Sequence, residues 1–330
     1  MRPFKYERAN DAKGAAATVS ANAAAKFLAG GTNLLDLMKE DVERPNTIVD
    51  ITRLSLAQIR NANGGVSLGA LAKNTETANH PLVRQNFPLL SMAILAGASG
   101  QIRNMATNGG NLLQRTRCSY FYDTAMPCNK REPNSGCGAL EGMNRMHAIF
   151  GWSEKCVAVY PSDMAIALAA LDATVKVQDA GGKERTINFT DFHRLPENTP
   201  EKDTNINQGE LITSIELPKN NFAGKSYYLK VRDRASYAFA LLSVAAALEM
   251  DGNKIKNVRL AMGGVSHKPW RAMEAEKMLV GKEATEANFK LAADAEMKNA
   301  KPLEHNKFKV ELGRRAIVRA LSMAMNGGKA

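Results

Sequence analysis

The chain has 330 residues, of which 45% are hydrophobic, and a formal net charge of +11 at pH 7. This length exceeds the size at which one hydrophobic core usually stops growing, so it predicts two or three domains. No stretch approaches the roughly eighteen apolar residues of a membrane-spanning helix. The Lys and Arg residues are spread along the chain without a basic run or a nucleic-acid motif, which argues against nucleic-acid binding and favours an acidic partner subunit.

The first part of the chain predicts a strand, a glycine turn, a helix and a second strand in succession. Residues 1–8 carry acidic and aromatic side chains and lack an apolar core, so we expect no signal peptide. The elements expected after them are a helix over 14–25, a strand over 25–29 that ends at Gly30-Gly31, a helix over 33–39, a strand over 47–51, a strand over 65–70 and a buried helix over 88–95.

Two glycine pairs are candidate phosphate-binding turns. Gly30-Gly31, between strand and helix, supplies unobstructed backbone N–H groups of the kind that bind a pyrophosphate. It does not match the Gly-x-Gly-x-x-Gly dinucleotide pattern, and tight turns also use glycine for conformational reasons alone. The second pair, in Asn108-Gly-Gly-Asn111, favours the phosphate interpretation because two such turns can hold the two ends of one dinucleotide.

All four cysteines fall in one window that opens just after the second glycine pair, with nine, eight and eighteen residues between successive cysteines. Four converging thiolates are the usual ligands of an iron-sulfur cube, whereas structural zinc sites usually bring at least one closely spaced pair. Two disulfides, zinc and free thiols therefore stay open beside a [4Fe-4S] cluster. His147 lies in the window as well, but a single histidine is more often a hydrogen-bonding or surface residue than a ligand.

The residues between the cysteines favour the cluster. Glycines let the backbone approach sulfur closely, and cations offset the negative charge of a cube with four thiolates. The glycines are Gly136, Gly138, Gly142 and Gly151, and the cations are Arg115, Arg117, Lys130, Arg131, Arg145 and Lys155.

The rest of the chain predicts further strands and a helical end. The expected elements are a helix over 163–171, a strand over 173–178, a polar loop over 196–209, a strand over 210–217, a boundary near 218–221, a mixture of strand and buried helix over 226–230, 239–250 and 258–265, and mostly amphipathic helix over 272–325.

Together these motifs resemble the FAD-binding subunit of the molybdenum hydroxylase family, which contains xanthine, aldehyde and carbon monoxide dehydrogenases. Ala29-Gly-Gly-Thr-Asn-Leu-Leu-Asp36 is similar to the first flavin motif of that family, and Gln101-Ile-Arg-Asn-Met-Ala-Thr-Asn-Gly-Gly-Asn111 to the second. The cysteine-bearing insertion, with Arg115-Thr-Arg-Cys-Ser-Tyr-Phe-Tyr-Asp123, resembles that of the FAD subunit of three-subunit periplasmic aldehyde oxidoreductases. In those enzymes the insertion holds a [4Fe-4S] cluster.

The resemblance implies an α+β fold. Residues 1–220 would form a two-part FAD-binding domain of the PCMH and VAO-like type, with the [4Fe-4S] insertion at about 115–157. Residues 221–330 would form a C-terminal α+β domain like that of carbon monoxide dehydrogenase flavoprotein, with a three-stranded sheet and helices.

The resemblance also implies the cofactor-binding residues. Asp163 and Lys230 match residues near the flavin, although a strand-edge lysine in water is the plainer interpretation of Lys230. One departure is Asn108, where many members carry a small or β-branched apolar residue. The residues expected to bind FAD are Lys26, Phe27, Leu28, Ala29, Gly30, Gly31, Thr32, Asn33, Leu34, Thr107, Gly110, Asn111, Asp163, Ile212 and Lys230, and those expected to hold the cluster are Cys118, Cys128, Cys137 and Cys156.

The function that the resemblance implies is electron transfer. Substrate would be oxidised on a molybdenum cofactor in a large partner subunit, with [2Fe-2S] clusters in a small one, so no catalytic residue is expected in this chain. FAD would pass the electrons to an external acceptor. The heterotrimer would be periplasmic, exported with a partner that carries a twin-arginine signal, or else cytoplasmic. The rival interpretations are the FAD subunit of a hydroxybenzoyl-CoA reductase-like enzyme and a non-enzymatic, metal-stabilised scaffold.

Overall fold

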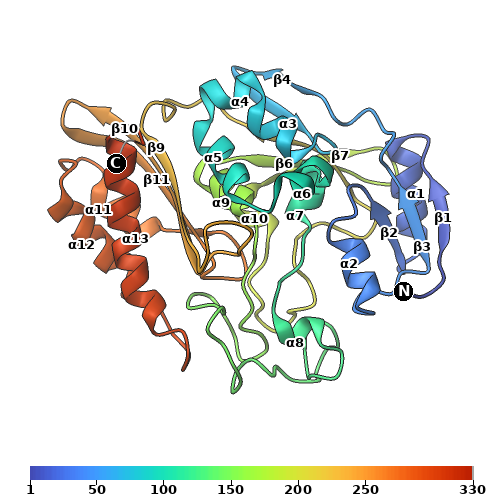
Figure 1. Cartoon of the computed structure of the whole chain (residues 1–330). Helices are drawn as coiled ribbons and strands as arrows, with labels where there is room; N and C mark the ends of the chain where they lie inside the picture. The colour runs from blue at the N-terminus through green and yellow to red at the C-terminus, as the bar shows by residue number, and fades with distance from the viewer. Residues whose placement is uncertain (329–330) are drawn as a thin grey trace.

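The computed structural model describes residues 1–328 and combines three β-sheets with helices in an α+β fold (Figure 1). The N-terminal lobe, blue in Figure 1, is a parallel sheet in the order β1-β3-β2. Its strands are β1 (Lys5–Arg8), β2 (Ala25–Leu28) and β3 (Thr47–Asp50), and its helices are α1 (Ala12–Ala21) and α2 (Leu34–Lys39).

The middle of the molecule is an antiparallel sheet in the order β4-β5-β8-β6-β7. Its strands are β4 (Ile59–Ala62), β5 (Gly65–Gly69), β6 (Thr174–Gln178), β7 (Glu184–Asn188) and β8 (Leu211–Leu217). The helices of this part are α3 (Asn74–Asn79), α4 (Pro81–Asn86), α5 (Pro88–Ala96), α6 (Gly100–Met105), α7 (Asn108–Leu112), α8 (Ser119–Tyr122), α9 (Asp163–Ala170) and α10 (Phe189–Phe192).

The C-terminal part is a second antiparallel sheet, in the order β12-β11-β10-β9, covered by helices that Figure 1 shows in red and orange. Its strands are β9 (Ser226–Val231), β10 (Leu242–Asp251), β11 (Lys254–Gly263) and β12 (Trp270–Arg271), and its helices are α11 (Met273–Leu279), α12 (Glu286–Met297) and α13 (Phe308–Met325).

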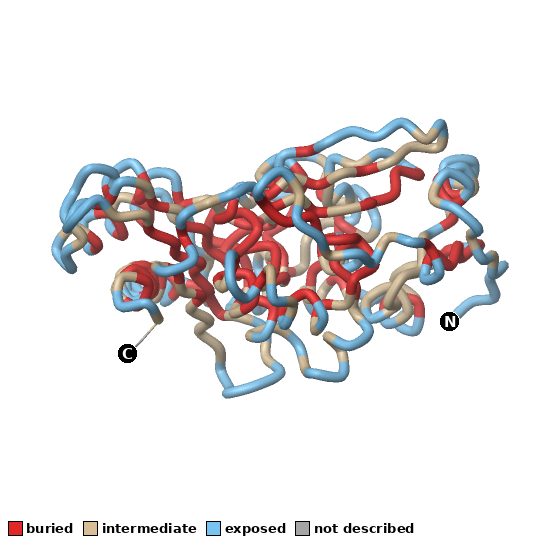
Figure 2. Tube along the Cα trace, turned by 90° about the horizontal axis from the view of Figure 1, so that it is seen from above, coloured by how far each residue is buried: buried red, intermediate tan, exposed pale blue. Residues whose placement is uncertain are grey.

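Strand β10 is buried on both faces and joins the two main hydrophobic cores. Val244 and Ala246 pack into the core that α11, α12 and α13 cover, whereas Ala245 and Ala247 face the core that contains α5 and α9. Small side chains on the second face let the two helices lie close to the sheet. The buried residues accordingly run through the centre of the molecule in Figure 2, with exposed loops around them.

Most of the predicted elements are present, with ends that differ by a few residues, and the polar loop over 196–209 has no helix or strand. The expected mixture of strand and helix over 239–250 and 258–265 is wrong, because β10 and β11 are strands. When both faces of an element are buried, a continuous apolar run is consistent with either a strand or a helix. The expected three-stranded C-terminal sheet is also wrong, since the two-residue β12 adds a fourth strand.

Several elements were not predicted at all. β1 is a polar edge strand, and β4 has no buried residue, so neither shows the apolar alternation of a buried strand. α7 contains Gly109 and Gly110 and reads as a loop, yet the Thr107 side chain caps it by accepting from the Gly110 N–H at 3.2 Å. Among residues 1–328, no helix is long and apolar enough to cross a membrane.

The packing of α9 gives a direct test of the central core. Leu168 is fully buried there, so Leu168→Ala should lower the free energy of unfolding by about 2–5 kcal/mol. Leu291→Ala in α12 is the matched control, because Leu291 is 57% exposed, and should change stability by less than about 0.5 kcal/mol. Denaturant unfolding measures both, and equal losses would contradict this packing.

Candidate functional site

One large cavity of about 1130 Å³ lies where the N-terminal lobe meets the middle sheet. Its volume exceeds the roughly 300–1,000 Å³ usual for small-molecule sites, as a dinucleotide requires. Every residue that the sequence predicts to bind FAD lines this cavity, from Lys26 to Leu34 and on to Lys230. The contacts of each with FAD stay a prediction, but the structure brings the whole set together.

The first glycine turn is pressed against the second flavin motif. A Cβ atom on Gly30 would lie 2.2 Å from the carbonyl oxygen of Met105 and 3.1 Å from the Cα of Ala106. Gly31 has a φ of +72°, in the left-handed region that favours glycine. Both glycines are therefore required by the backbone here, and the two motifs form one continuous wall of the cavity.

Asn108, the departure from the family pattern, is fully buried and satisfied. Its amide group donates to the Gly69 carbonyl at 3.2 Å and to Thr77 Oγ1 at 2.9 Å, and its oxygen accepts from Asn74 at 3.2 Å. A second bond runs from Asn111 to the Asn74 oxygen at 2.8 Å. This polar network fixes α7 against the middle sheet and α3, so the departure supports the second motif.

A buried ion pair forms another wall of the cavity. Lys230 Nζ lies 2.7 Å from Asp163 Oδ2 and donates to the Ala96 carbonyl at 3.0 Å. Tyr228 donates to Asp163 Oδ1 at 2.7 Å, and burial raises the pKa of its hydroxyl, so it stays a donor. The interpretation of Lys230 as a strand-edge lysine in water is wrong, because its side chain is only 5% exposed. Fixed partners of this kind hold a charge pair in one orientation.

Several stretches of the cavity wall were not predicted from the sequence, and two of them carry aromatic or charged side chains. The loop after β9 contributes Arg234, Tyr237 and Phe239, and Arg117 stacks on the Phe239 ring at 5.4 Å. His193 contributes from beside α10, where its Nε2 lies 2.9 Å from the Leu112 carbonyl and burial lowers the ring pKa to about 4. The only sequence signal for the loop after β9 was its two aromatic residues, Tyr237 and Phe239, in a polar segment. His193 reaches the cavity through packing between residues that are far apart in the chain, which no local pattern indicates.

All four cysteines are free thiols and line a second, very small cavity of about 10 Å³. Cysteines from both ends of the insertion therefore line one cavity, and none of the four is in a disulfide. Within residues 1–328 no group of three or more His, Cys, Asp or Glu side chains is spaced to hold a single metal ion.

Neighbouring backbone N–H groups favour the thiolate forms of two cysteines. Burial is the largest effect on Cys118 and raises its pKa to about 11, while the N–H groups of Phe121 and Tyr120 act in the opposite direction. A hydrogen bond from Cys156 is the main cause that lowers the pKa of Cys137 to about 6, and the N–H groups of Ala139, Val157 and Leu140 lower it further. Such donors stabilise thiolates and cluster sulfur, so the donor set fits an iron-sulfur cluster.

His147 links this second cavity to the C-terminal part. Its Nε2 lies 3.1 Å from Cys118 Sγ, and burial lowers its pKa to about 4, so the ring is neutral at pH 7. The backbone carbonyl of His147 accepts from Lys309 Nζ at 2.9 Å, and Lys309, at the start of α13, is fully buried. Burial lowers the pKa of Lys309 to about 7.

Several of the glycines and cations of the insertion have contacts other than those expected from the sequence. A Cβ on Gly138 would lie 2.8 Å from the Tyr120 ring, and one on Gly142 would lie 2.1 Å from the Tyr120 hydroxyl, so these two glycines also make room for that side chain. Their approach to sulfur stays a prediction. Three of the cations are already paired with carboxylates, namely Arg115, Lys130 and Arg145.

Comparison with known proteins agrees with this geometry. Residues 2–220 match the family described as the FAD binding domain in molybdopterin dehydrogenase, and residues 227–324 match the CO dehydrogenase flavoprotein C-terminal domain. The chain therefore belongs to the family of FAD-binding subunits of the molybdenum hydroxylases, and the expected fold class is confirmed.

Individual relatives are similar over nearly their whole length. The aldehyde oxidoreductase FAD-binding subunit PaoB of Escherichia coli is 49% identical over 98% of this chain and 99% of its own. The glyceraldehyde dehydrogenase medium chain of Sulfolobus acidocaldarius is 32% identical over 97% and 96%. A solved structure of carbon monoxide dehydrogenase from Hydrogenophaga pseudoflava shares the fold, with a TM-score of 0.78, 24% identity and coverage of 99% and 98%.

The contact at Gly30 provides a test of the cavity wall. Gly30→Ala should weaken FAD binding by at least about tenfold, because the new methyl group would push the two flavin motifs apart against backbone atoms. Gly100→Ala is the matched control, since a Cβ there meets nothing within 4 Å. Fluorescence titration of flavin-depleted protein with FAD measures both affinities, and an unchanged affinity in Gly30→Ala would contradict the assignment.

Proposed function

We propose that this chain is the FAD-binding, electron-transferring subunit of a molybdenum-dependent aldehyde oxidoreductase. The observation that carries the proposal is the 49% identity to the PaoB subunit over nearly the full length of both chains. A second relative, the glyceraldehyde dehydrogenase medium chain, is also named for an aldehyde substrate. The substrate would be oxidised in a partner subunit, and the electrons would leave through this chain to an external acceptor.

Bound FAD supplies the ability to take up electrons one at a time and release them in pairs. The residues of the chain bind and orient it. The turn at Gly30 and Gly31 would offer backbone N–H groups to the pyrophosphate, and Thr107, Gly110 and Asn111 would contact the ribityl and ring portion. The Asp163–Lys230 pair, held by Tyr228, would present a fixed charge pair near the flavin ring.

We further propose that Cys118, Cys128, Cys137 and Cys156 hold a [4Fe-4S] cluster. Three features support this: the four thiols are free, they line one small cavity, and neighbouring backbone N–H groups favour the thiolate forms of Cys118 and Cys137. The His147 ring adds a hydrogen bond to Cys118 from a second direction. The cube would bind among these four side chains, with one thiolate ligand from each cysteine.

The expected partners follow from the same proposal. The relatives are named as subunits or medium chains, which supports a multi-subunit enzyme. A large subunit with the molybdenum cofactor and a small one with [2Fe-2S] clusters would complete a heterotrimer. Export to the periplasm, with a twin-arginine signal on a partner, stays a prediction.

Substitution of the ligands tests the cluster. Wild-type protein purified without oxygen should contain about four irons and four sulfides per chain. Cys137→Ser should lose most of the iron and the absorption near 400 nm that iron-sulfur cubes give, on the order of a tenfold loss, because a weak alkoxide replaces a thiolate. Ser119→Ala, beside Cys118 in the exposed first turn of α8, is the control and should keep its iron. Equal iron in all three proteins would refute the assignment.

Separation of the subunits tests the electron-transfer role. The purified chain should hold flavin that an artificial reductant reduces, but it should oxidise aldehydes at a negligible rate because the substrate site belongs to a partner. Adding the partner subunits should restore aldehyde-dependent reduction of the flavin, followed by its absorbance at 450 nm. Substantial aldehyde turnover by the single chain would contradict the proposal.

A further inference from the structure

Arg115 occupies the boundary between the two cavities. It lines the large cavity and lies in the sequence just before Cys118, while its guanidinium group stacks on Phe121 at 4.7 Å from the ring centroid. Phe121 lines the small cavity. The Arg115 side chain is only 18% exposed. A charged group in this position contacts the walls of both sites at once.

The contacts of Arg115 reach three separate parts of the chain. Its Nη1 donates to Glu43 Oε1 at 2.7 Å, in the N-terminal lobe, and its Nε donates to Asp203 Oδ2 at 2.9 Å, in the loop before β8. Its backbone N–H donates to Asn33 Oδ1 at 2.9 Å. Asn33 lies directly after the glycine turn of the first flavin motif, so Arg115 positions that turn through its backbone and the lobe through its side chain.

A second cation extends this network to the cysteines. Lys130, whose side chain is 1% exposed, is paired with Asp203 and donates to the Pro200 carbonyl at 2.7 Å. Lys130 also lines the small cavity. Burial alone would raise the pKa of Asp203, but the adjacent Lys130 and Arg115 more than offset this and hold it well below its ordinary value. The carboxylate is thus ionised and shared between the two cations.

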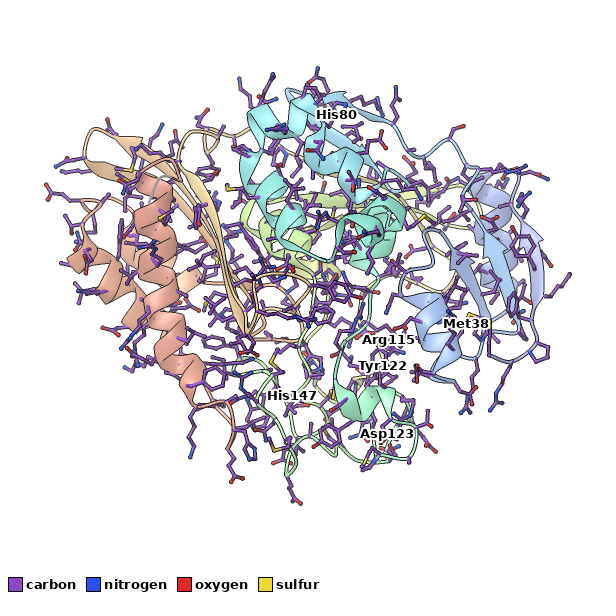
Figure 3. All side chains as sticks on the ribbon, viewed as in Figure 1. Met38, His80, Arg115, Tyr122, Asp123 and His147 are labelled. Carbon is purple, nitrogen blue, oxygen red and sulfur yellow. The ribbon has the colours of Figure 1, made fainter. Side chains whose placement is uncertain are left out.

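Besides the ion pairs, apolar and polar contacts also connect the cysteine-bearing insertion to α2. Leu37 of α2 packs in one buried cluster with Phe121 and Cys128, and Tyr122 donates to Asp36 Oδ2 at 3.2 Å. Figure 3 labels Arg115 and Tyr122, which lie on the side of the insertion that faces α2. Because α2 follows the glycine turn, the cysteine segment contacts the helix that adjoins the first flavin motif.

We propose that the Arg115 network couples the two cofactor sites, so that the iron-sulfur cluster and FAD each strengthen the binding of the other. Arg115 is a positioning residue in this scheme, because it acts through Asn33, Glu43 and Asp203. The inference rests on the proposed function in one respect, namely that the second site holds an iron-sulfur cluster. Energetic coupling between two sites is reciprocal, so it is measurable from the FAD side alone.

The first test uses the full-length wild-type chain with and without its cluster. FAD is removed, the cluster is kept in one sample and stripped by oxidation and chelation in the other, and both are titrated with FAD by flavin fluorescence. Stripping the cluster should weaken FAD binding by about tenfold, within the roughly 5–150-fold range of measured couplings. An equal affinity in the two samples would overturn the coupling.

The second test locates the coupling in Arg115. Arg115→Gln removes the side-chain ion pairs to Glu43 and Asp203 but keeps the backbone N–H bond to Asn33. It should weaken FAD binding of the cluster-bearing protein and remove most of the further effect of stripping the cluster. Arg271→Gln is the matched control: the Arg271 side chain is only 11% exposed and likewise bridges two carboxylates, Asp172 just after α9 and Glu276 in α11. It should lose stability but keep the full cluster-dependent change in FAD affinity. Arg115→Gln that also keeps the full change would overturn the role of Arg115.

Iron and sulfide analysis of the wild type separates the two levels of failure. A wild type without iron would overturn the cluster assignment and the coupling with it. A wild type that holds iron but binds FAD equally well without it would overturn the coupling alone and leave the proposed function intact. The wild-type comparison decides the matter even where Arg115→Gln folds poorly.

Discussion

The close approach of two backbone segments at Gly30 is the constraint on which the cofactor site depends. The glycine turn after β2 touches the backbone at Met105 and Ala106 with no room for a side chain. This contact connects the N-terminal lobe to the helices beside the middle sheet, and the large cavity lies where these two parts meet. Without it the two flavin motifs would be separate loops on separate lobes, and neither could enclose a dinucleotide.

Buried charged side chains then hold the parts of the chain around the Gly30 contact in place. Asp163 and Lys230 face each other across the join between the middle part and the C-terminal sheet, while Arg115, Glu43, Asp203 and Lys130 connect the lobe, the insertion and the loop before β8. Buried ion pairs contribute little net stability, but removing one partner leaves an uncompensated charge and is strongly destabilising. Such pairs therefore specify how the parts sit relative to one another more than they stabilise any one part.

The sequence predicted local features well because their signals are local. The strand and turn before Gly31, the buried α9 and the clustering of the cysteines all follow from neighbouring residues. The resemblance to a family supplied the FAD residues, which composition and spacing alone left open. The strand β10 was misread because its apolar run is buried on both faces. The partners of Arg115 and the buried Lys309 depend on contacts between distant segments, which no local pattern reports.

The measurement that tests this account most directly is the cofactor content of protein purified without oxygen, read from its absorption spectrum together with FAD, iron and sulfide per chain. The account predicts about one FAD, about four irons and about four sulfides per chain. A folded protein that binds neither flavin nor iron, even when both are supplied, would contradict it and leave the glycine turns and the cysteines with purely structural roles.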